Sequence, residues 1–299
     1  MHRLRRGIGI AGVFAVTACA SAATPAQHAA VAPAASAPPV STPRTTASPT
    51  APVIKRPPRP KVIVSYFRAA DGTVVTAARF SGPVHYRLHS GSSDPGSAAL
   101  SVVRAGPAVG SGERRRLLAA FNGGFLLSAH AGGYEQEGHI ISPLRRGLAS
   151  LVIDRSGTAR IGVWGSGLPR PGESVFSVRQ NLRPLVRGGH ATGAAAAWTA
   201  WGATLGGGED VARSALGENA AGELIYAAGM STTPADLAAA LVHAGARTAM
   251  ELDINPEWVQ LDVARRPGRG LRAAIPGQVR SADQYLIGWT RDFIAVLAA

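Results

Sequence analysis

Residues 223–256 read ELIYAAGMSTTPADLAAALVHAGARTAMELDINP, and this stretch decides the predicted fold. The run ELIYA at its start and the run TAMELDI near its end are apolar stretches typical of strands. Between them, Thr233 precedes a proline and, three residues later, an acid, which is the pattern of a helix start. Gly245 is a typical helix end. The order strand, helix, strand predicts a βαβ unit with parallel strands and a right-handed crossover.

The chain from residue 61 onwards is predicted to form one domain around this unit. Its first half is rich in strand-like runs, and Asp71-Gly72 and Ser156-Gly157 each separate two of them, which predicts two β-hairpins. A chain of about 240 residues can bury one sizeable core. We therefore expect residues 61–299 to adopt an α+β or mixed α/β fold. A mixed β-sheet would form the core, with flanking helices and the βαβ unit near the C-terminal end.

Composition excludes several classes of protein. A single cysteine cannot form an internal disulfide, no Cys/His cluster offers a structural zinc site, and no apolar run reaches the roughly 18 residues of a spanning helix. The formal net charge of +13 suggests a nucleic-acid partner, but the first sixty residues carry seven Lys or Arg and no acid. The remaining 24 basic and 18 acidic residues are spread along the chain, so we expect no nucleic-acid partner.

The N-terminus has the pattern of an export signal. Three arginines among the first six residues precede a short apolar stretch, and Val16-Thr17-Ala18-Cys19 resembles the lipobox of bacterial lipoproteins. Residues 1–19 are therefore predicted to be a lipoprotein-type signal peptide. Lipidated Cys19 would hold the protein at the outer face of the cell membrane. The alternative is ordinary cleavage after an Ala-x-Ala-like stretch, which discards Cys19 and releases a secreted protein.

Residues 20–60 are almost wholly Ala, Pro, Ser, Thr and Val. A segment of this composition cannot bury enough apolar surface to offset the entropy lost on ordering, so we predict a disordered linker. We expect a monomer whose contact with the membrane is the lipid anchor alone.

The second predicted strand ends in an unusual acidic pattern. Glu251, Asp253 and Asn255 alternate with apolar residues, so on a strand they would point to one face. Burying a carboxylate is costly unless it is paired, hydrogen-bonded or bound to a cation. The two acids could be a general acid/base pair or, with Asn255, ligands of a divalent cation, although nothing requires a cofactor. Equally, Glu251 could pair with a buried arginine while residues 253–256 form a turn.

Two further motifs suit an anionic ligand. Asn122-Gly123-Gly124 directly follows an apolar run, and its glycines allow backbone N–H groups to approach an anion closely. Arg213 begins the motif Arg-Ser-Ala-Leu-Gly and could clamp a phosphate or carboxylate through two parallel hydrogen bonds. Each motif alone has a plain alternative, which is a tight turn for the glycines and a solvated surface position for the arginine.

In their order along the chain, these motifs resemble the phosphodiester glycosidase (uncovering-enzyme-like) family. The resembling stretches are 122–125 (NGGF), 132–134 (GGY), 147–153 (GLASLVI), 162–165 (GVWG), 178–182 (VRQNL), 184–186 (PLV), 213–217 (RSALG) and 249–253 (AMELD). The resemblance covers roughly residues 115–297. It is nearest to secreted actinobacterial members that carry the stretch Ala-Met-Glu-Leu-Asp-Ile-Asn-Pro.

The resemblance implies a secreted or surface-anchored hydrolase that cleaves the glycosidic bond of a sugar-1-phosphodiester in an envelope glycan or glycolipid. By position, it assigns substrate or phosphate binding to Asn122, Gly123, Gly124 and Arg213, and catalysis to Asp253. Glu251 is a second candidate for catalysis and Asn255 for binding. The expected partner is thus a carbohydrate phosphodiester or a polymer of the cell envelope.

One departure from the family leaves alternatives open. Many members continue the strand as Leu-Asp-Gly-Gly-Gly-Ser, whereas this chain continues after Asp253 with Ile-Asn-Pro and lacks that glycine cradle. A cell-surface lipoprotein that binds glycans without cleaving them is therefore one alternative. Another is a structural envelope protein in which Glu251, Asp253 and Arg213 form a buried salt-bridge network.

Overall fold

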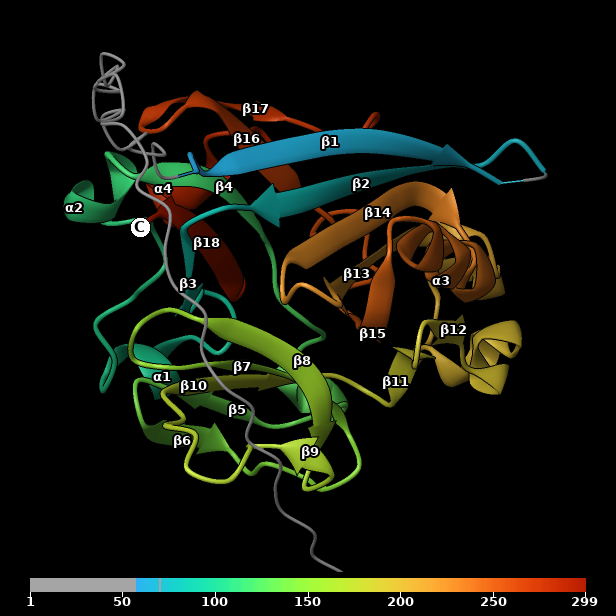
Figure 1. The fold of residues 1–299 in the computed structure, drawn as a ribbon, viewed down its shortest axis with the longest axis horizontal. Coiled ribbons are helices and arrows are strands. Elements are labelled where there is room, and N and C mark those ends of the chain that lie inside the picture. The colour runs from blue at the N-terminus through green and yellow to red at the C-terminus, as the bar shows by residue number, and fades with distance from the viewer. Residues whose placement is uncertain (1–57, 70) are drawn as a thin grey trace, which may run out of the picture. The chain divides into compact units, whose positions relative to one another are not determined.

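The computed structural model describes residues 58–69 and 71–299 (Figure 1). The predicted signal peptide, the lipidation site at Cys19 and most of the predicted linker lie outside these residues. Strands hold 43% of the structure and helices 14%, so the fold is β-rich. The expected α+β or mixed α/β class is therefore wrong. The physical reason is that most of the apolar runs pair with antiparallel neighbours, which leaves little chain for helices.

In the residues that the structure describes, the strands form three sheets. The seven-stranded sheet has the order β1 (Lys61–Arg68), β2 (Val74–Ser81), β14 (Leu224–Thr232), β13 (Val211–Asn219), β15 (Ala246–Glu251), β11 (Pro184–Arg187) and β12 (His190–Ala191). The six-stranded sheet has the order β6 (His139–Ser142), β5 (Tyr134–Gln136), β10 (Ser177–Gln180), β7 (Ala149–Ile153), β8 (Ala159–Trp164) and β9 (Gly167–Leu168). The five-stranded sheet has the order β17 (Arg269–Ala273), β16 (Leu261–Arg266), β4 (Leu117–Asn122), β18 (Phe293–Ala298) and β3 (Val84–His89).

Among the described residues, the helices are short apart from one. The α-helices are α1 (Ser97–Leu100), α2 (Ser111–Arg114), α3 (Pro234–His243) and α4 (Gln284–Ile287), and 3-10 turns span Leu127–Ala129, Gly193–Ala196, Trp198–Ala200 and Leu205–Gly207. Helix α3 packs its buried residues, among them Leu237 and Leu241, against the seven-stranded sheet. In the described part of the chain, no helix combines the length and the apolar character that crossing a membrane needs.

The predicted βαβ unit has the right elements but the wrong pairing. Strand β14, helix α3 and strand β15 follow one another as expected. However, β13 lies between the two strands and pairs antiparallel with both, so β14 and β15 run in the same direction without contacting each other through a ladder. Within residues 58–69 and 71–299, only β8 and β9 pair in parallel. The sequence of the unit itself does not reveal this insertion, because the inserted strand precedes it in the chain.

Both predicted hairpins are confirmed. Strands β1 and β2 pair in register from Lys61 opposite Ser81 to Arg68 opposite Val74, and Asp71 accepts the N–H of Thr73 at 2.8 Å in the turn. Strands β7 and β8 pair on either side of Gly157, whose φ of 86° lies in the left-handed region that glycine adopts without strain.

An aromatic row joins two of the sheets. Phe80 of β2 stacks on Phe121 of β4 with a centroid distance of 5.6 Å, and Phe121 contacts Tyr226 of β14 at 4.9 Å. All three are fully buried, and burying each such side chain contributes roughly 1.5–3 kcal/mol. The Tyr226 hydroxyl donates to Asn122 Oδ1 at 2.7 Å, so this row ends at one of the predicted site residues.

Replacing Thr233 by alanine is expected to lower the free energy of unfolding by about 1 kcal/mol. The reason is that Thr233 Oγ1 accepts the N–H of Asp236 at 3.1 Å, where α3 begins. Thr233→Ser keeps this oxygen and should stay within about 0.5 kcal/mol of the unmodified protein. Urea denaturation of both variants measures the difference, and equal losses would contradict the role of the cap.

Candidate active site

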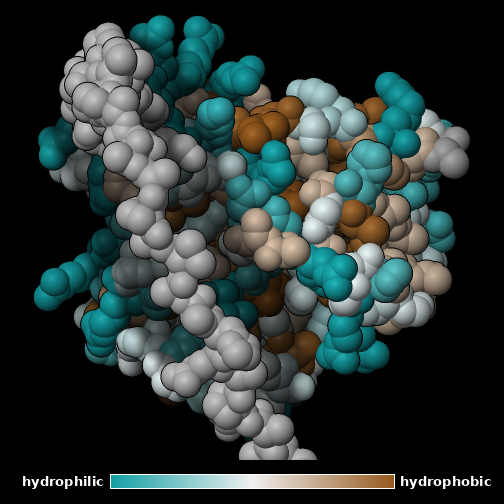
Figure 2. All heavy atoms as spheres, viewed as in Figure 1, coloured by the Kyte–Doolittle hydropathy of each residue, from teal (hydrophilic) through white to brown (hydrophobic). Residues whose placement is uncertain are grey.

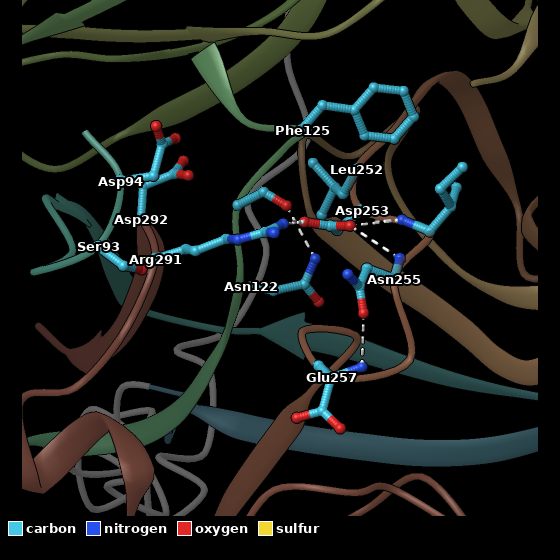
Figure 3. A network of polar contacts seen from close by, with 12 residues as sticks. Ser93, Asp94, Asn122, Phe125, Leu252, Asp253, Asn255, Glu257, Arg291 and Asp292 are labelled. Atoms are coloured by element: carbon cyan, nitrogen blue, oxygen red, sulfur yellow. Dashed lines mark hydrogen bonds and ion pairs between the residues drawn. The ribbon is translucent and has the colours of Figure 1, made fainter. Parts of the chain in front are cut away.

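Asp253 lies just beyond the end of β15 and is held from several directions (Figure 3). Its Oδ1 accepts the backbone N–H groups of Ile254 and Asn255 at 2.8 and 2.9 Å. Ser214 of β13 holds the backbone, because its Oγ donates to the Asp253 carbonyl at 3.0 Å and accepts the Asp253 N–H at 3.1 Å. The carboxylate is thus fixed in orientation while the residue is only 3% exposed.

Arg291 completes this arrangement at the wall of a pocket. Its Nη1 donates to Asp253 Oδ2 at 2.7 Å, and Figure 3 shows the guanidinium aimed at the carboxylate. The pocket has a volume of about 420 Å³ and is lined by Phe125, Leu126, Ala129, His130, Ala131, Leu182, Gly202, Ala203, Asp253, Ile254, Asn255 and Arg291. Burial raises the pKa of Asp253, although Arg291 and the two N–H groups oppose that shift. The pocket thus offers one acid and one arginine among mainly apolar walls.

Arg213 and Glu251 lie elsewhere, in a buried ion pair. Arg213 Nη1 donates to Glu251 Oε1 at 2.8 Å and to the Trp201 carbonyl at 3.1 Å, and both charged side chains are fully buried. Burial raises the pKa of Glu251 to about 8, although Arg213 opposes the shift. Neither residue lines the Asp253 pocket. The sequence analysis places Glu251 and Arg213 in one site with Asp253. In the structure, both residues lie outside the pocket that Asp253 lines.

Asn122 supports the site without lining it. At the end of β4 its Nδ2 donates to Ser214 Oγ at 2.9 Å, and its Oδ1 accepts from the Tyr226 hydroxyl at 2.7 Å and from the Gln260 N–H at 3.1 Å. Ser214 in turn holds the backbone of Asp253. Asn122 is therefore connected to Asp253 through one serine, a residue that the sequence analysis overlooked.

Gly123 and Gly124 pack closely against a second buried ion pair. A Cβ added at Gly123 would lie 1.9 Å from Asp292 Oδ2, and one at Gly124 would lie 3.0 Å from the Arg179 guanidinium. The N–H of Gly123 donates to the Asp292 carbonyl at 2.8 Å. Close approach of these charged side chains accounts for both glycines, whereas the predicted anion cradle would need a free N–H at Gly123.

The residues that hold this second pair were missed by sequence reasoning. Arg179 Nε donates to Asp292 Oδ2 at 2.7 Å, with both side chains about 1% exposed. Asp94 lies beside Asp292 in Figure 3, and burial together with the Asp292 charge raises the pKa of Asp94 to about 6. The sequence gives little signal for Arg179, because β10 reads Ser-Val-Arg-Gln and no apolar run marks the arginine as buried.

An aromatic and cationic stack lies beside Arg291. The Arg280 guanidinium lies 4.0 Å from the ring centroid of Trp258 and 4.7 Å from that of Trp289, and Arg291 lies 4.7 Å from Trp258. Trp289 is 60% exposed, which is unusual for so large an apolar side chain. A flat aromatic surface of this kind suits the apolar face of a sugar ring.

The oxygen-rich residues do not come together as a cation site. Glu251 faces Arg213, Asp253 faces Arg291, and Asn255 Oδ1 accepts the N–H of Glu257 at 2.9 Å. Within the described ranges, no group of three or more His, Cys, Asp or Glu residues is arranged to hold a metal ion.

Comparison with known proteins gives a likeness in fold. No protein-family model matches the chain, and no curated protein is similar to it in sequence. Among solved structures, the chain is similar to the catalytic domain of zebrafish N-acetylglucosamine-1-phosphodiester alpha-N-acetylglucosaminidase, auto-inhibited by its pro-peptide. The TM-score is 0.51 at 15% identity, covering 80% of this chain and 83% of that one. At this identity the likeness shows a shared fold and not membership of a family.

Two other solved structures are more distant. A hypothetical protein from Synechocystis gives a TM-score of 0.44 at 12% identity, covering 81% of this chain and 64% of the other. A Burkholderia pseudomallei protein described as exported gives 0.30 at 14% identity, covering 81% and 58%. Likenesses this weak define neither fold nor function.

Gly123→Ala is expected to lower the free energy of unfolding by about 3 kcal/mol, because the new methyl group must displace Asp292 from its buried partner Arg179. Gly112→Ala is the matched control. A Cβ at Gly112 meets nothing within 4 Å, and the residue is helical, so this change should be neutral or stabilising by up to about 1 kcal/mol. Chemical denaturation measures both, and similar values for the two variants would contradict the packing argument.

Stability is expected to fall as the pH rises from about 5 to 8. The pKa of Glu251 rises from 4.5 to about 8 on folding and that of Asp262 from 3.8 to about 7, both mainly through burial. In this window the folded state binds more protons than the unfolded state, so stability is greatest below the unfolded pKa values and is lost towards the folded ones. Glu251→Gln should flatten the slope of the unfolding free energy against pH. An unchanged slope would contradict a raised pKa of Glu251 in the folded protein.

Proposed function

We propose that the protein is a hydrolase that cleaves the glycosidic bond of a sugar-1-phosphodiester in an envelope glycan or glycolipid. The observation that carries the proposal is the pocket in which the buried Asp253 carboxylate meets Arg291, in a fold shared with a phosphodiester glycosidase catalytic domain. A sugar phosphodiester combines an anionic group with a ring that has apolar faces, and the pocket offers a guanidinium beside apolar walls.

Arg291 is the residue best placed to bind the phosphodiester. Its side chain is 14% exposed and lines the pocket, whereas Arg213 is fully enclosed by Glu251 and backbone carbonyls. A guanidinium can donate to a phosphate through two parallel N–H groups, and one of the Arg291 nitrogens is committed to Asp253. The same charge would stabilise the departing phosphate monoester, the electrostatic effect that usually dominates such catalysis.

Asp253 is assigned the role of base for water. A water molecule attacks the anomeric carbon while the bond from that carbon to the phosphate oxygen breaks, so the electron pair of this bond leaves with the phosphate. The carboxylate takes the proton of the water and supports the positive charge that develops on the sugar. Phosphate is a weaker base than an alkoxide and leaves with little protonation, so the pocket's single acid can suffice.

A second candidate is a protein that binds such glycans without cleaving them. The specific observation in its favour is that both Asp253 oxygens already have partners, Oδ1 the two backbone N–H groups and Oδ2 the Arg291 guanidinium. These donors already occupy three of the acceptor positions of the carboxylate, which leaves it little room to accept a proton from water. The exposed Trp289 and its neighbour Trp258 would serve a binding protein as well as an enzyme.

The site of action is proposed from the sequence. Three features are typical of an exported protein: the signal-like segment, the lipobox-like cysteine and the acid-free tether. The protein is anchored through Cys19, or it is secreted if cleavage removes that residue. We propose a monomer that reaches envelope polymers from this tether.

Asp253→Asn is expected to reduce release of free sugar from a sugar-1-phosphodiester by about 100-fold or more, because the amide cannot accept the proton. The assay uses the full chain and a panel of sugar-1-phosphodiesters, with and without a chelator. Asp210→Asn, at an exposed acid outside the pocket, is the control that should keep full activity. Unchanged turnover in Asp253→Asn would reject the assignment, and saturable binding without any released sugar would favour the binding protein.

A further inference from the structure

A second and larger cavity lies between two sheet edges, and none of the predicted site residues lines it. It is a groove of about 710 Å³ bordered by β1 on one side and by β16, the loop after it and β17 on the other. Strand β1 ends the seven-stranded sheet and β17 ends the five-stranded sheet, and Figure 1 shows β1 running past β16 and β17. The groove shares no lining residue with the Asp253 pocket.

The charged residues that line this groove are all basic. They are Lys61, Arg265, Arg266 and Arg272, and all four are exposed. No acid is among the lining residues, and none of the four has an ion pair or a side-chain hydrogen bond with any residue in the described ranges. Figure 2 shows hydrophilic side chains gathered along the upper edge of the molecule, near the region where Figure 1 places these strands.

Four like charges gathered without counter-charges repel one another, and an anion bound among them relieves that repulsion. The open edge of β1 adds to the attraction, because an edge strand presents unpaired backbone N–H and C=O groups. On the β1 side the groove is lined by residues 60–64, and five extended residues span roughly 16 Å. The groove is therefore long enough for more than one phosphate group of an extended chain.

We propose that this groove is a binding site for a flexible polymer whose sugars or polyols are joined by phosphodiesters. The groove has no aromatic lining residue on which nucleic-acid bases could stack, so a single-stranded nucleic acid fits it less well. The protein's own N-terminal segment cannot neutralise the groove, because residues 1–57 contain no Asp or Glu. A concave channel between two strands also suits a chain better than the flat surface of a membrane.

The proposal does not depend on the hydrolase assignment. A groove that holds a phosphate-rich polymer would keep the domain on an envelope surface whether the Asp253 pocket cleaves its ligand or only binds it. The two sites can be changed by separate substitutions. A result that contradicts the proposed groove therefore does not contradict the proposed hydrolase, and the reverse also holds.

The test measures binding of the full chain to poly(glycerol phosphate) by titration at several salt concentrations. We assume that the groove neutralises about four phosphates and that about 0.7 counterion is released for each. Raising the salt concentration from about 50 to about 200 mM should then weaken binding roughly 50-fold. The double variant Arg265→Glu with Arg272→Glu should bind at least about tenfold more weakly and show about half the salt dependence.

The control variant is Arg187→Glu with Arg247→Glu, which changes the net charge equally at two exposed arginines outside the groove. It should bind like the unmodified protein, and circular dichroism should show that both variants are folded. The proposal is overturned if the groove variant binds normally or if the control loses as much affinity. Tighter binding to an oligothymidylate or to vesicles containing anionic lipid than to poly(glycerol phosphate) would also overturn it.

Discussion

Two adjacent residues of opposite charge, Arg291 and Asp292, hold the three sheets together at the site. They directly precede β18 of the five-stranded sheet. Arg291 pairs with Asp253, which follows β15 of the seven-stranded sheet, and Asp292 pairs with Arg179 of β10 in the six-stranded sheet. The seven-stranded and six-stranded sheets thus contribute one charge each, and both meet the dipeptide that leads into the five-stranded sheet. The pocket lies where this junction meets solvent, so the same ion pairs that position the sheets also position the acid.

Burying these charges has a cost that constrains their neighbours. A charge that loses its partner in the interior is strongly destabilising, by about 3–5 kcal/mol, so neither member of the Arg179–Asp292 pair can be exchanged alone. Gly123 has no side chain because Asp292 occupies the space where one would lie. Asn122 has no free hydrogen-bonding group because Ser214, Tyr226 and Gln260 take them. Residues that resemble ligand-binding motifs in the sequence are thus explained by the packing around a buried charge.

The sequence predicts well what depends on near neighbours. The turn at Asp71-Gly72 and the helix start at Thr233 use contacts within four residues, and both occur in the structure. The acidic strand end could be recognised because burying carboxylates in an apolar run needs a reason. The partners of those acids could not be recognised from the sequence. Arg291 lies 38 residues after Asp253, and Arg179 lies 113 residues before Asp292, distances over which spacing carries no information. The predicted direct pairing of the two parallel strands is wrong for the same reason. Strand β13, which comes earlier in the chain, lies between β14 and β15.

The distribution of charge, rather than its total, separates the two sites. A net charge of +6 beyond residue 60 describes a mildly basic domain. Of its acids, Asp253, Asp292, Glu251 and Asp262 are buried. Asp292 and Glu251 lie against arginines that are themselves enclosed, whereas Asp253 pairs with Arg291 at the wall of the pocket. Asp262 is satisfied by two glutamine side chains. The arginines of β16 and β17 keep their full charge at the surface. A buried ion pair removes one acid and one base together, so burial leaves the net charge of the exterior close to that of the composition. The unpaired arginines of β16 and β17 form a local basic cluster within it. An anionic ligand approaching the domain encounters that unpaired charge before it encounters the single arginine of the pocket.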